Sequence, residues 1–438
     1  MRPVAVLGVV LSCLPLAVAC QRPTVLVVAL DGGDWDVIMP LVEASYLPTI
    51  ARLVGRGAKA DLDCVPADPL TACYCPPVWT SIVTGQPYEK HRIGSIWDRS
   101  SARKAPALWT VLADEGRTST LISVRATWPP EPEPDWVLTE PGLDFAAGQI
   151  YDRWPSNTDT RVLNAQNRAK PEGLFEALGL LPHDGPRLPA WKSFARDRVA
   201  MEGLLRLARL QLSTSGDPWP PGPIVAIGTA PDAWPNVKPV GRGGTIGAMA
   251  SGVRERRTEG RRSDLTMITI HSIDRAEHMG WGRIQPRPGD PIDQESLLQL
   301  AEAWEGPVFN PGPWGWGSVA SQYLEADAWL GRLLEEVPYD YVVFVSDHGM
   351  SRNPSPGLTG AHDRGVPDAH LGIFAMTGPG IRYGVDLGTV SVLDVAPTVA
   401  YLLNLPVPVD LPGRVLEEAF FDPFVEARPV REVTSWPE

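Results

Sequence analysis

Short apolar runs that end in polar turns dominate the hydrophobic pattern of this chain. Residues 24–30 and 341–345 are continuous apolar runs rich in valine, and residues 265–270 and 372–376 have a similar character. Runs of this length without polar alternation are typical of strands buried on both faces, as in parallel α/β sheets. The pattern therefore predicts an α/β fold with a mostly parallel central sheet.

Polar residues follow several of these runs. Asp31 comes directly after the first run, Asp347 and His348 follow residues 341–345, and a polar segment follows residues 265–270. In open α/β sheets the chemistry gathers beyond the carboxyl ends of the strands. We therefore expect functional side chains at these strand ends.

Two long segments interrupt the pattern. Residues 127–195 are rich in Pro, Trp, Asp and Gly, and residues 214–262 are rich in Pro and Gly and then in Arg. Helical patterns lie around residues 47–53 and across 196–213. We interpret the two segments as insertions that could form a cap over a site, with solvated surface loops as the alternative. Residues 21–438 are thus predicted to form a single domain with inserted segments.

The first 20 residues have the three-part layout of a secretory signal peptide. One arginine is followed by an apolar run and by small residues before Cys20, and the run is too short for a comfortable membrane span. The ending also resembles a bacterial lipoprotein processing site, in which a lipidated Cys20 would tether the protein to a membrane. An ordinary cleaved signal is the alternative. Both predict a location outside the cytoplasm, in the bacterial periplasm or cell envelope.

Composition and charge narrow the classes of function. The chain has 438 residues, of which 44% are hydrophobic, so a wholly disordered chain is excluded. It carries 39 basic and 52 acidic residues, a formal charge of −13, and no long basic stretch. This balance argues against nucleic-acid binding through phosphate neutralisation. An acidic enzyme acting on anionic substrates needs local positive charge, which metal ions can supply.

Aspartate and histidine residues of the kind that bind metals occur in four separated segments. Asp274 and His278 are four positions apart, which on a helical turn places both side chains on one face. Only seven histidines exist, and three lie in these segments. Mixed carboxylate and imidazole donors suit zinc or a similar transition ion, and six donors are enough for two ions. The six candidate ligands are Asp31, Asp274, His278, Asp347, His348 and His362.

A fifth segment begins at Cys75, which is followed by two prolines. Proline favours the first turn of a helix, so Cys75 is predicted at or just before a helix N-terminus, where the macrodipole lowers a thiol pKa. A thiolate there could ligate zinc, act as a nucleophile or face a phosphate; a buried structural cysteine or a disulfide partner is the alternative. With Cys64 and Cys73, an odd number of thiols follows the leader, so an oxidising compartment leaves one unpaired.

Together these segments resemble the alkaline phosphatase superfamily, in particular its type I phosphodiesterase and nucleotide pyrophosphatase branch. The resemblance covers roughly residues 24–125 and 265–416. It implies a three-layer α/β/α sandwich and a small phosphate ester as substrate. The motifs that carry it lie at residues 30–35, 47–53, 77–85, 274–278, 346–350, 394–398 and 411–414.

The resemblance also implies a site for two divalent metal ions, most often zinc, that clamp a phosphoryl group. One ion would be held by Asp274, His278 and His362, with His370 as a rival for the last position. The second ion would be held by Asp31, Asp347, His348 and the nucleophile. A covalent intermediate on the nucleophile would then be hydrolysed.

Cys75 departs from the family pattern, which has Ser or Thr at this position. Sulfatases of the same superfamily carry Cys there and oxidise it to formylglycine, but their pattern needs Arg where this chain has Trp79. Three hypotheses follow: a phosphohydrolase cleaving phosphodiesters or phosphomonoesters, a sulfatase-type hydrolase using Cys75, and a catalytically impaired metal-binding relic. Because the other site residues are intact, a Cys64–Cys73 pair that leaves Cys75 free is favoured over a disulfide at Cys75.

Overall fold

The computed structural model describes only part of the chain in detail. The described residues are 22–64, 73–95, 98–127, 131, 133–138, 197, 200–201, 204–205, 262–304, 318–354, 359–362, 369 and 371–437. The predicted signal peptide, most of the two predicted insertions and His370 lie outside them.

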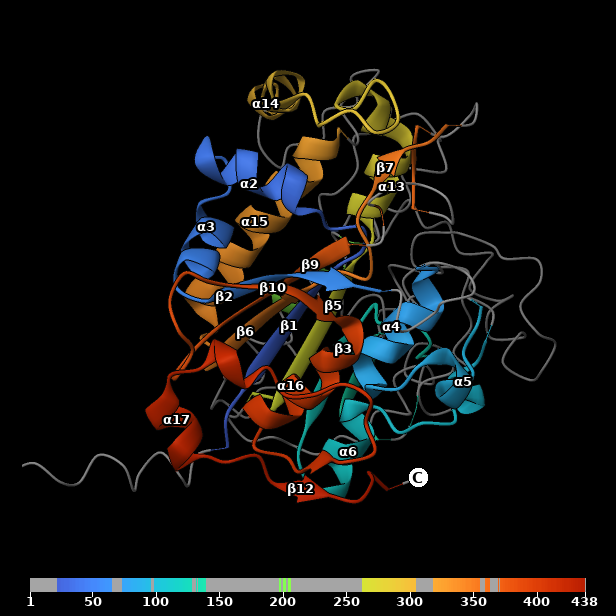
Figure 1. Ribbon diagram of the computed structural model, residues 1–438, viewed down its shortest axis with the longest axis vertical. Coiled ribbons are helices and arrows are strands. Elements are labelled where there is room, and N and C mark those ends of the chain that lie inside the picture. Colours follow the sequence, from blue (N-terminus) through green and yellow to red (C-terminus); the bar gives the residue numbers. More distant parts are fainter. Residues whose placement is uncertain are drawn as a thin grey trace, which may run out of the picture.

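An eight-stranded sheet forms the centre of the molecule (Figure 1). The strand order is β10-β2-β9-β6-β1-β5-β3-β4, and all neighbours pair in parallel except β9, which is antiparallel to both β2 and β6. The predicted mostly parallel sheet is confirmed. Its strands are β1 (Val25–Leu30), β2 (Ala58–Asp63), β3 (Ser119–Ile122), β4 (Trp136–Leu138), β5 (Leu265–Ile270), β6 (Tyr341–Val345), β9 (Leu371–Thr377) and β10 (Val385–Ser391).

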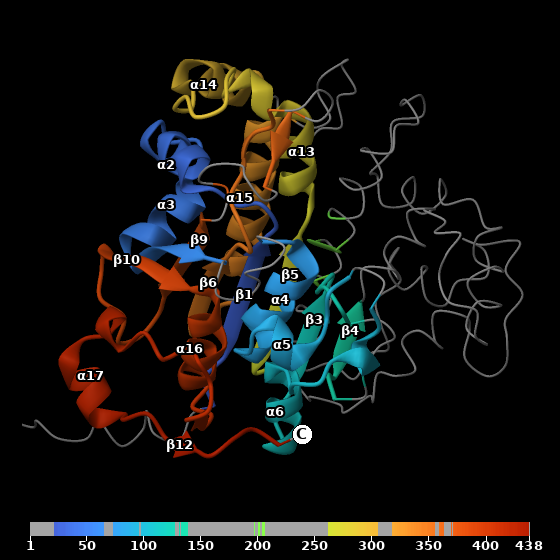
Figure 2. The ribbon, with the colours of Figure 1, turned by 45° about the vertical axis from the view of Figure 1, so that its right-hand side comes forward.

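Helices cover both faces of this sheet (Figure 2). One layer contains α4 (Cys75–Thr84), α6 (Leu108–Asp114) and α16 (Val395–Leu402). The opposite layer contains α2 (Trp35–Glu43), α3 (Pro48–Gly55), α13 (Ser272–Gly280), α14 (Gln294–Glu302) and α15 (Val319–Glu336). The fold is therefore the three-layer α/β/α sandwich that the family resemblance implied.

Burial on both faces explains the unbroken apolar runs. In β1, Val25, Val27 and Ala29 pack into the core on the α4 side. The alternating residues Leu26, Val28 and Leu30 pack into the core on the α15 side. Because successive side chains of a strand point to opposite faces, a strand between two helical layers has no polar face.

Smaller elements complete the described structure. They are α5 (Tyr88–His91), α17 (Asp422–Ala427), the short 3-10 helices at Ser100–Ala102, Trp281–Arg283, Val392–Asp394 and Glu417–Ala419, the antiparallel pair β7 (Ser351–Arg352) and β8 (Gly360–Ala361), and the parallel pair β11 (Val407–Pro408) and β12 (Glu432–Val433). Within the described residues no single helix is long and apolar enough to span a membrane; α2 and α3 reach those criteria only as a pair with a 103° bend.

Parts of the predicted intervening region are described. Residues 197, 200, 201, 204 and 205 are helical, in agreement with the helix predicted across 196–213. Strand β4 lies inside the segment 127–195, which the sequence pattern indicates as an insertion, and it pairs with β3 at the edge of the central sheet.

Candidate metal centre

The predicted site residues come together at the carboxyl edge of the sheet. Strand β1 lies between β5 and β6 and runs parallel to both, so the three strands end at one edge. Asp31 follows β1, α13 with Asp274 follows β5, and Asp347 follows β6. This is the convergence that the positions of these residues after apolar runs predict.

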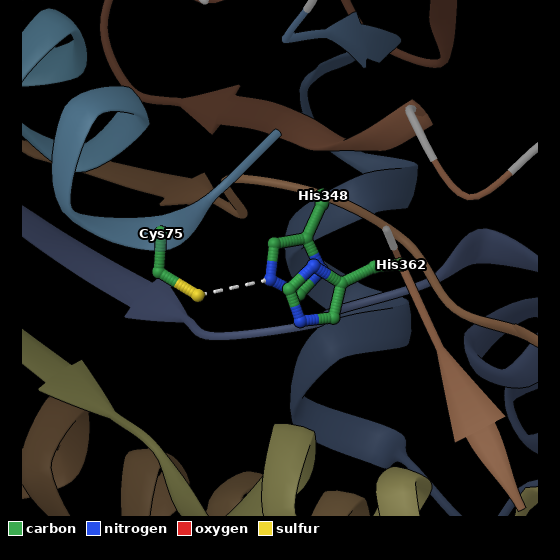
Figure 3. A group of neighbouring side chains, drawn as sticks. All are labelled: Cys75, His348 and His362. Carbon is green, nitrogen blue, oxygen red and sulfur yellow. Dashed lines mark hydrogen bonds between the residues drawn. The ribbon is translucent and has the colours of Figure 1, made fainter. Parts of the chain in front are cut away.

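A four-residue group consists of Asp31, Cys75, Asp347 and His348. One donor atom from each residue lies within 4.8 Å of the others, and all four residues are buried. His348 Nε2 is 3.4 Å from Cys75 Sγ (Figure 3). It is also 3.4 Å from an Asp347 oxygen and 3.7 Å from an Asp31 oxygen. His348 Nδ1 donates to the Gly349 carbonyl at 2.9 Å, so Nε2 presents its lone pair to the group.

A three-residue group consists of Asp274, His278 and His362. His278 Nε2 is 3.2 Å and His362 Nε2 is 3.7 Å from the same oxygen, Asp274 Oδ1. His278 Nδ1 donates to the Gly360 carbonyl at 2.9 Å, which leaves its Nε2 as an acceptor or ligand. The four-residue spacing of Asp274 and His278 on α13 does place both side chains on one face, as predicted.

The two groups adjoin each other. The rings of His348 and His362 stack with centroids 3.6 Å apart and planes inclined by 8°. Cys75, His348 and His362 also have donor atoms within 4.8 Å of one another, and Figure 3 shows the sulfur directed toward the two rings. The seven predicted residues therefore form one continuous cluster, while their individual roles as ligands stay predictions.

Three buried carboxylate oxygens in this cluster have no hydrogen-bond partner: Asp31 Oδ1, Asp347 Oδ2 and Asp274 Oδ1. Leaving a buried polar atom unpaired is unfavourable, and native structures rarely do so. Each of these oxygens lies beside the Nε2 nitrogen of His348 or His278. Carboxylate oxygen, imidazole nitrogen and thiol sulfur are a donor set that zinc accepts, so these residues fit a metal ion.

The pKa shifts in the cluster also fit a bound metal ion. Burial, and then the charges of Asp31 and Asp274, raise the pKa of Asp347 well above its usual value. Burial and neighbouring carboxylates likewise raise the pKa of the Cys75 thiol. Both shifts express the cost of gathering negative charge away from water. A bound cation would reverse them, because it stabilises the ionised forms.

Helix α4 fixes the position of Cys75. The helix begins at Cys75, with Pro76 and Pro77 in its first turn, and ends at Gly85, whose φ of 67° is the left-handed conformation of a C-terminal cap. Proline fits the first turn because the amide hydrogens there have no partner within the helix, and glycine adopts positive φ without strain. Cys75 thus stands at the positive end of the helix dipole.

A disulfide joins Cys64 to Cys73, and Cys75 is a free, buried thiol. The favoured cysteine pairing is therefore confirmed. The bond connects the residue after β2 to the segment immediately before α4. The disulfide holds the segment before Cys75 against the end of β2, and the Cys75 thiol remains free to take part in the four-residue group.

Two site residues were missed by the sequence analysis: His271 and Arg125. His271 Nδ1 lies 2.5 Å from Asp31 Oδ2, and Arg125 Nη2 donates to the same oxygen at 3.0 Å. Burial alone would raise the pKa of Asp31, but the hydrogen bond with His271 and the charge of Arg125 hold it well below its usual value. Since His271 directly follows β5, the strand-end rule that found Asp31 could have found it too.

Comparison with known families agrees with this picture. A sandwich of this kind, with these donor groups at its strand ends, is the architecture that the resemblance to the alkaline phosphatase superfamily implied. The family model described as Type I phosphodiesterase / nucleotide pyrophosphatase matches residues 25–365. The chain belongs to this family of hydrolases. No curated protein sequence matches it.

Several solved structures are similar to this one. Murine ectonucleotide pyrophosphatase / phosphodiesterase 5 is 13% identical, with 91% of this chain and 100% of that chain covered at a TM-score of 0.46. A mutant of the alkaline phosphatase PafA is 14% identical, with 92% and 99% covered at 0.47. The 2-O GAG sulfatase BT1596 is 13% identical, with 95% and 76% covered at 0.45.

Proposed function

We propose that this protein is a metal-dependent phosphohydrolase that cleaves phosphodiester or phosphomonoester bonds of small substrates and uses two zinc ions. One observation carries the proposal. Seven residues from five separated segments of the sequence meet in two adjoining donor groups, and three of their buried carboxylate oxygens have no other partner. Family membership supports hydrolysis of phosphoric esters or anhydrides.

In this proposal each of the two groups holds one ion. Asp31, Cys75, Asp347 and His348 would hold one ion, and Asp274, His278 and His362 the other. When bound, two such ions supply positive charge that stabilises a phosphoryl group and its attacking and leaving oxygens. Cys75 presents its sulfur at the N-terminus of α4, where the helix dipole favours an anion. It therefore occupies the nucleophile's position in this proposal.

The protein is further proposed to act outside the cytoplasm, in the periplasm or cell envelope. The Cys64–Cys73 disulfide supports this location, because such bonds persist in oxidising compartments. A membrane tether through a lipidated Cys20 belongs to the same proposal. The net charge of −13 supports a small-molecule substrate over nucleic acid.

The test combines metal analysis with an ester panel. Purified protein should contain close to two zinc equivalents and should hydrolyse nitrophenyl phosphate mono- or diesters, with loss of activity on chelation. The double variant Asp347→Ala with His348→Ala should lose one equivalent and the activity. Asp264→Asn is the control, since Asp264 is a buried aspartate that precedes β5 at the opposite edge of the sheet. Protein that carries no transition metal would refute the proposal.

A sulfatase-type hydrolase is the second candidate, and the free thiol of Cys75 at the nucleophile's position favours it. Where the sulfatase pattern needs arginine, this chain has Trp79, a residue of α4 that is 2% exposed and packs in the core. Mass spectrometry of active protein decides between the candidates. An unmodified Cys75 excludes the formylglycine route, and an oxidised Cys75 with turnover of nitrophenyl sulfate establishes it. Protein with two zinc equivalents that turns over no ester would be the metal-binding relic.

A further inference from the structure

The two carboxylate oxygens of Asp31 have different surroundings. Oδ2 is contacted by His271 Nδ1 and Arg125 Nη2 at 2.5 and 3.0 Å. Oδ1 has no hydrogen-bond partner and lies 3.7 Å from His348 Nε2, inside the four-residue group. Asp31 and His271 are wholly buried, and the Arg125 side chain is 7% exposed. One oxygen is therefore held by protein while the other faces the candidate metal position.

His271 is itself held from its other side. Its Nε2 lies 3.0 Å from the Ser123 carbonyl oxygen, so both ring nitrogens face acceptors. Ser123 follows β3, His271 follows β5 and Asp31 follows β1, and these three strands are consecutive neighbours in the sheet. The imidazole thus spans the ends of three strands, and its orientation is fixed by contacts at both nitrogens.

The turn that carries Arg125 has an unusual backbone. Ser123 and Ala126 have φ values of 59° and 56°, a conformation that is disfavoured for residues with a Cβ atom. Strained backbone of this kind persists where the surrounding structure enforces it, and it is frequent at functional sites. Here the turn directs the Ser123 carbonyl to His271 and the Arg125 guanidinium to Asp31.

We propose that Arg125 and His271 are positioning residues for Asp31: they occupy Oδ2 and present Oδ1 alone to the cation of the four-residue group. The carboxylate is then oriented before an ion arrives, and it acts as a one-oxygen ligand. This inference rests on the proposed function to the extent that the cluster binds metal. Loss of an outer partner of a metal ligand typically lowers metal affinity about 10–100-fold.

A second buried pair provides a matched control. Arg117 Nη2 lies 3.3 Å from Asp264 Oδ1, with side chains 7% and 1% exposed, against 7% and 0% for Arg125 and Asp31. Arg117 precedes β3 and Asp264 precedes β5, so this pair sits at the opposite edge of the sheet. Arg117→Met removes an equally buried arginine that is distant from the donor groups.

The experiment measures zinc affinity of the full chain by competition with a chromogenic chelator. It also records the thiolate-to-metal charge-transfer absorption of the cobalt-loaded protein, which reports on the group containing Cys75. Arg125→Met and His271→Leu are expected to weaken one of two bound equivalents about 10–100-fold and to alter the absorption. The other equivalent should keep its affinity. Arg117→Met should change neither quantity.

Conservative variants separate positioning from a general loss of structure. The amide of His271→Asn can still donate to Asp31 and should retain most of the affinity. Arg125→Lys keeps the charge but lacks the planar guanidinium, so it should weaken binding of the same zinc equivalent as Arg125→Met. If Arg125→Met does not fold, the zinc affinity of Arg125→Lys tests the proposal in its place. Unchanged affinities and absorption in Arg125→Met and His271→Leu, or an equal loss in Arg117→Met, would overturn the proposal. Wild-type protein that binds no metal would overturn it together with the proposed function, whereas wild-type protein that binds metal but hydrolyses no ester would overturn only the latter.

Discussion

The four-residue and three-residue groups differ in completeness and in exposure. Asp31, Asp347 and His348 are 0% exposed, and with Cys75 they supply the four donors that zinc takes in closed sites. Within the described residues the three-residue group supplies three donors, one fewer than the first group, and its His278 side chain is 18% exposed. Sites that exchange a ligand with solvent or substrate have this incomplete form. Under the proposed function, we therefore expect the first group to retain its ion and the second group to exchange a ligand.

The two groups also differ in charge balance. The four-residue group gathers two carboxylates and a thiol around one imidazole, and burial together with the charges of Asp31 and Asp274 raises the pKa of Asp347. In the three-residue group, burial and the charge of Asp31 act to raise the pKa of Asp274, but its close contact with His278 and the charges of the neighbouring imidazoles lower it to about 2. One carboxylate faces two imidazoles there. The first group therefore has the higher ratio of acidic donors to imidazoles.

The largest effect is expected from His278→Ala. Removing one of the three donors found among the described residues leaves two, too few to retain an ion, so zinc content should fall from two equivalents to one. Activity should drop by more than about 100-fold, the upper end of the loss seen for mere outer-shell partners. Elemental analysis and initial rates measure both. Met279→Ala, which alters an exposed neighbour on α13, is the control and should behave as wild type.

A smaller effect on metal content is expected from Asp347→Ala. Three donors remain in its group, so the ion should be retained, with an affinity lowered by more than the roughly 10–100-fold expected for loss of an outer partner. Competition titration against a chelator measures this loss. Complete loss of the ion, equal to that in His278→Ala, would contradict the difference between the two groups.

The charge imbalance predicts a pH effect in metal-free protein. Because the folded-state pKa of Asp347 is raised, this group contributes stability at low pH that is lost as pH rises above the unfolded value near 4. Asp347→Asn removes that dependence. We compare the free energies of unfolding of Asp347→Asn and wild type, both without metal. Above about pH 4, the difference in favour of the variant should grow by up to about 1.4 kcal/mol for each pH unit. Urea unfolding at several pH values, with chelator present, tests the slope; parallel curves would speak against it.

The smallest effect is expected from Cys75→Ser. Serine matches the family position and keeps an oxygen donor at the start of α4, so phosphodiesterase activity should be retained or raised. Cys75→Ala, which removes the donor, should lose activity. Both variants are assayed after their metal content has been verified. Inactivity of a folded, metal-replete Cys75→Ser protein would mean that the thiol itself is essential.

The sequence allowed the strands and the meeting of the donors to be predicted, because both follow from local patterns. An unbroken apolar run such as 24–30 indicates a strand that is buried on both of its faces. Residues that directly follow parallel strands lie together at the carboxyl end of the sheet. The direction of β9 was not predictable, since its apolar run is like those of the parallel strands. Arg125 was missed because its contact with Asp31 depends on the turn at Ser123 and Ala126. The residues with positive φ in this turn are not glycines, so the sequence does not indicate the turn's conformation. The roles of the seven ligands stay predictions.

The position of β1 in the sheet has a consequence for how the protein folds. It is the first described strand along the chain, yet its partners are β5 and β6, with Val25 opposite Leu265 and Tyr341. During synthesis the strand has no neighbour until most of the polypeptide exists. Pairings between such distant segments form slowly and leave apolar strands exposed to aggregation. The centre of the sheet is therefore completed late, although β1 is synthesised before both of its partner strands.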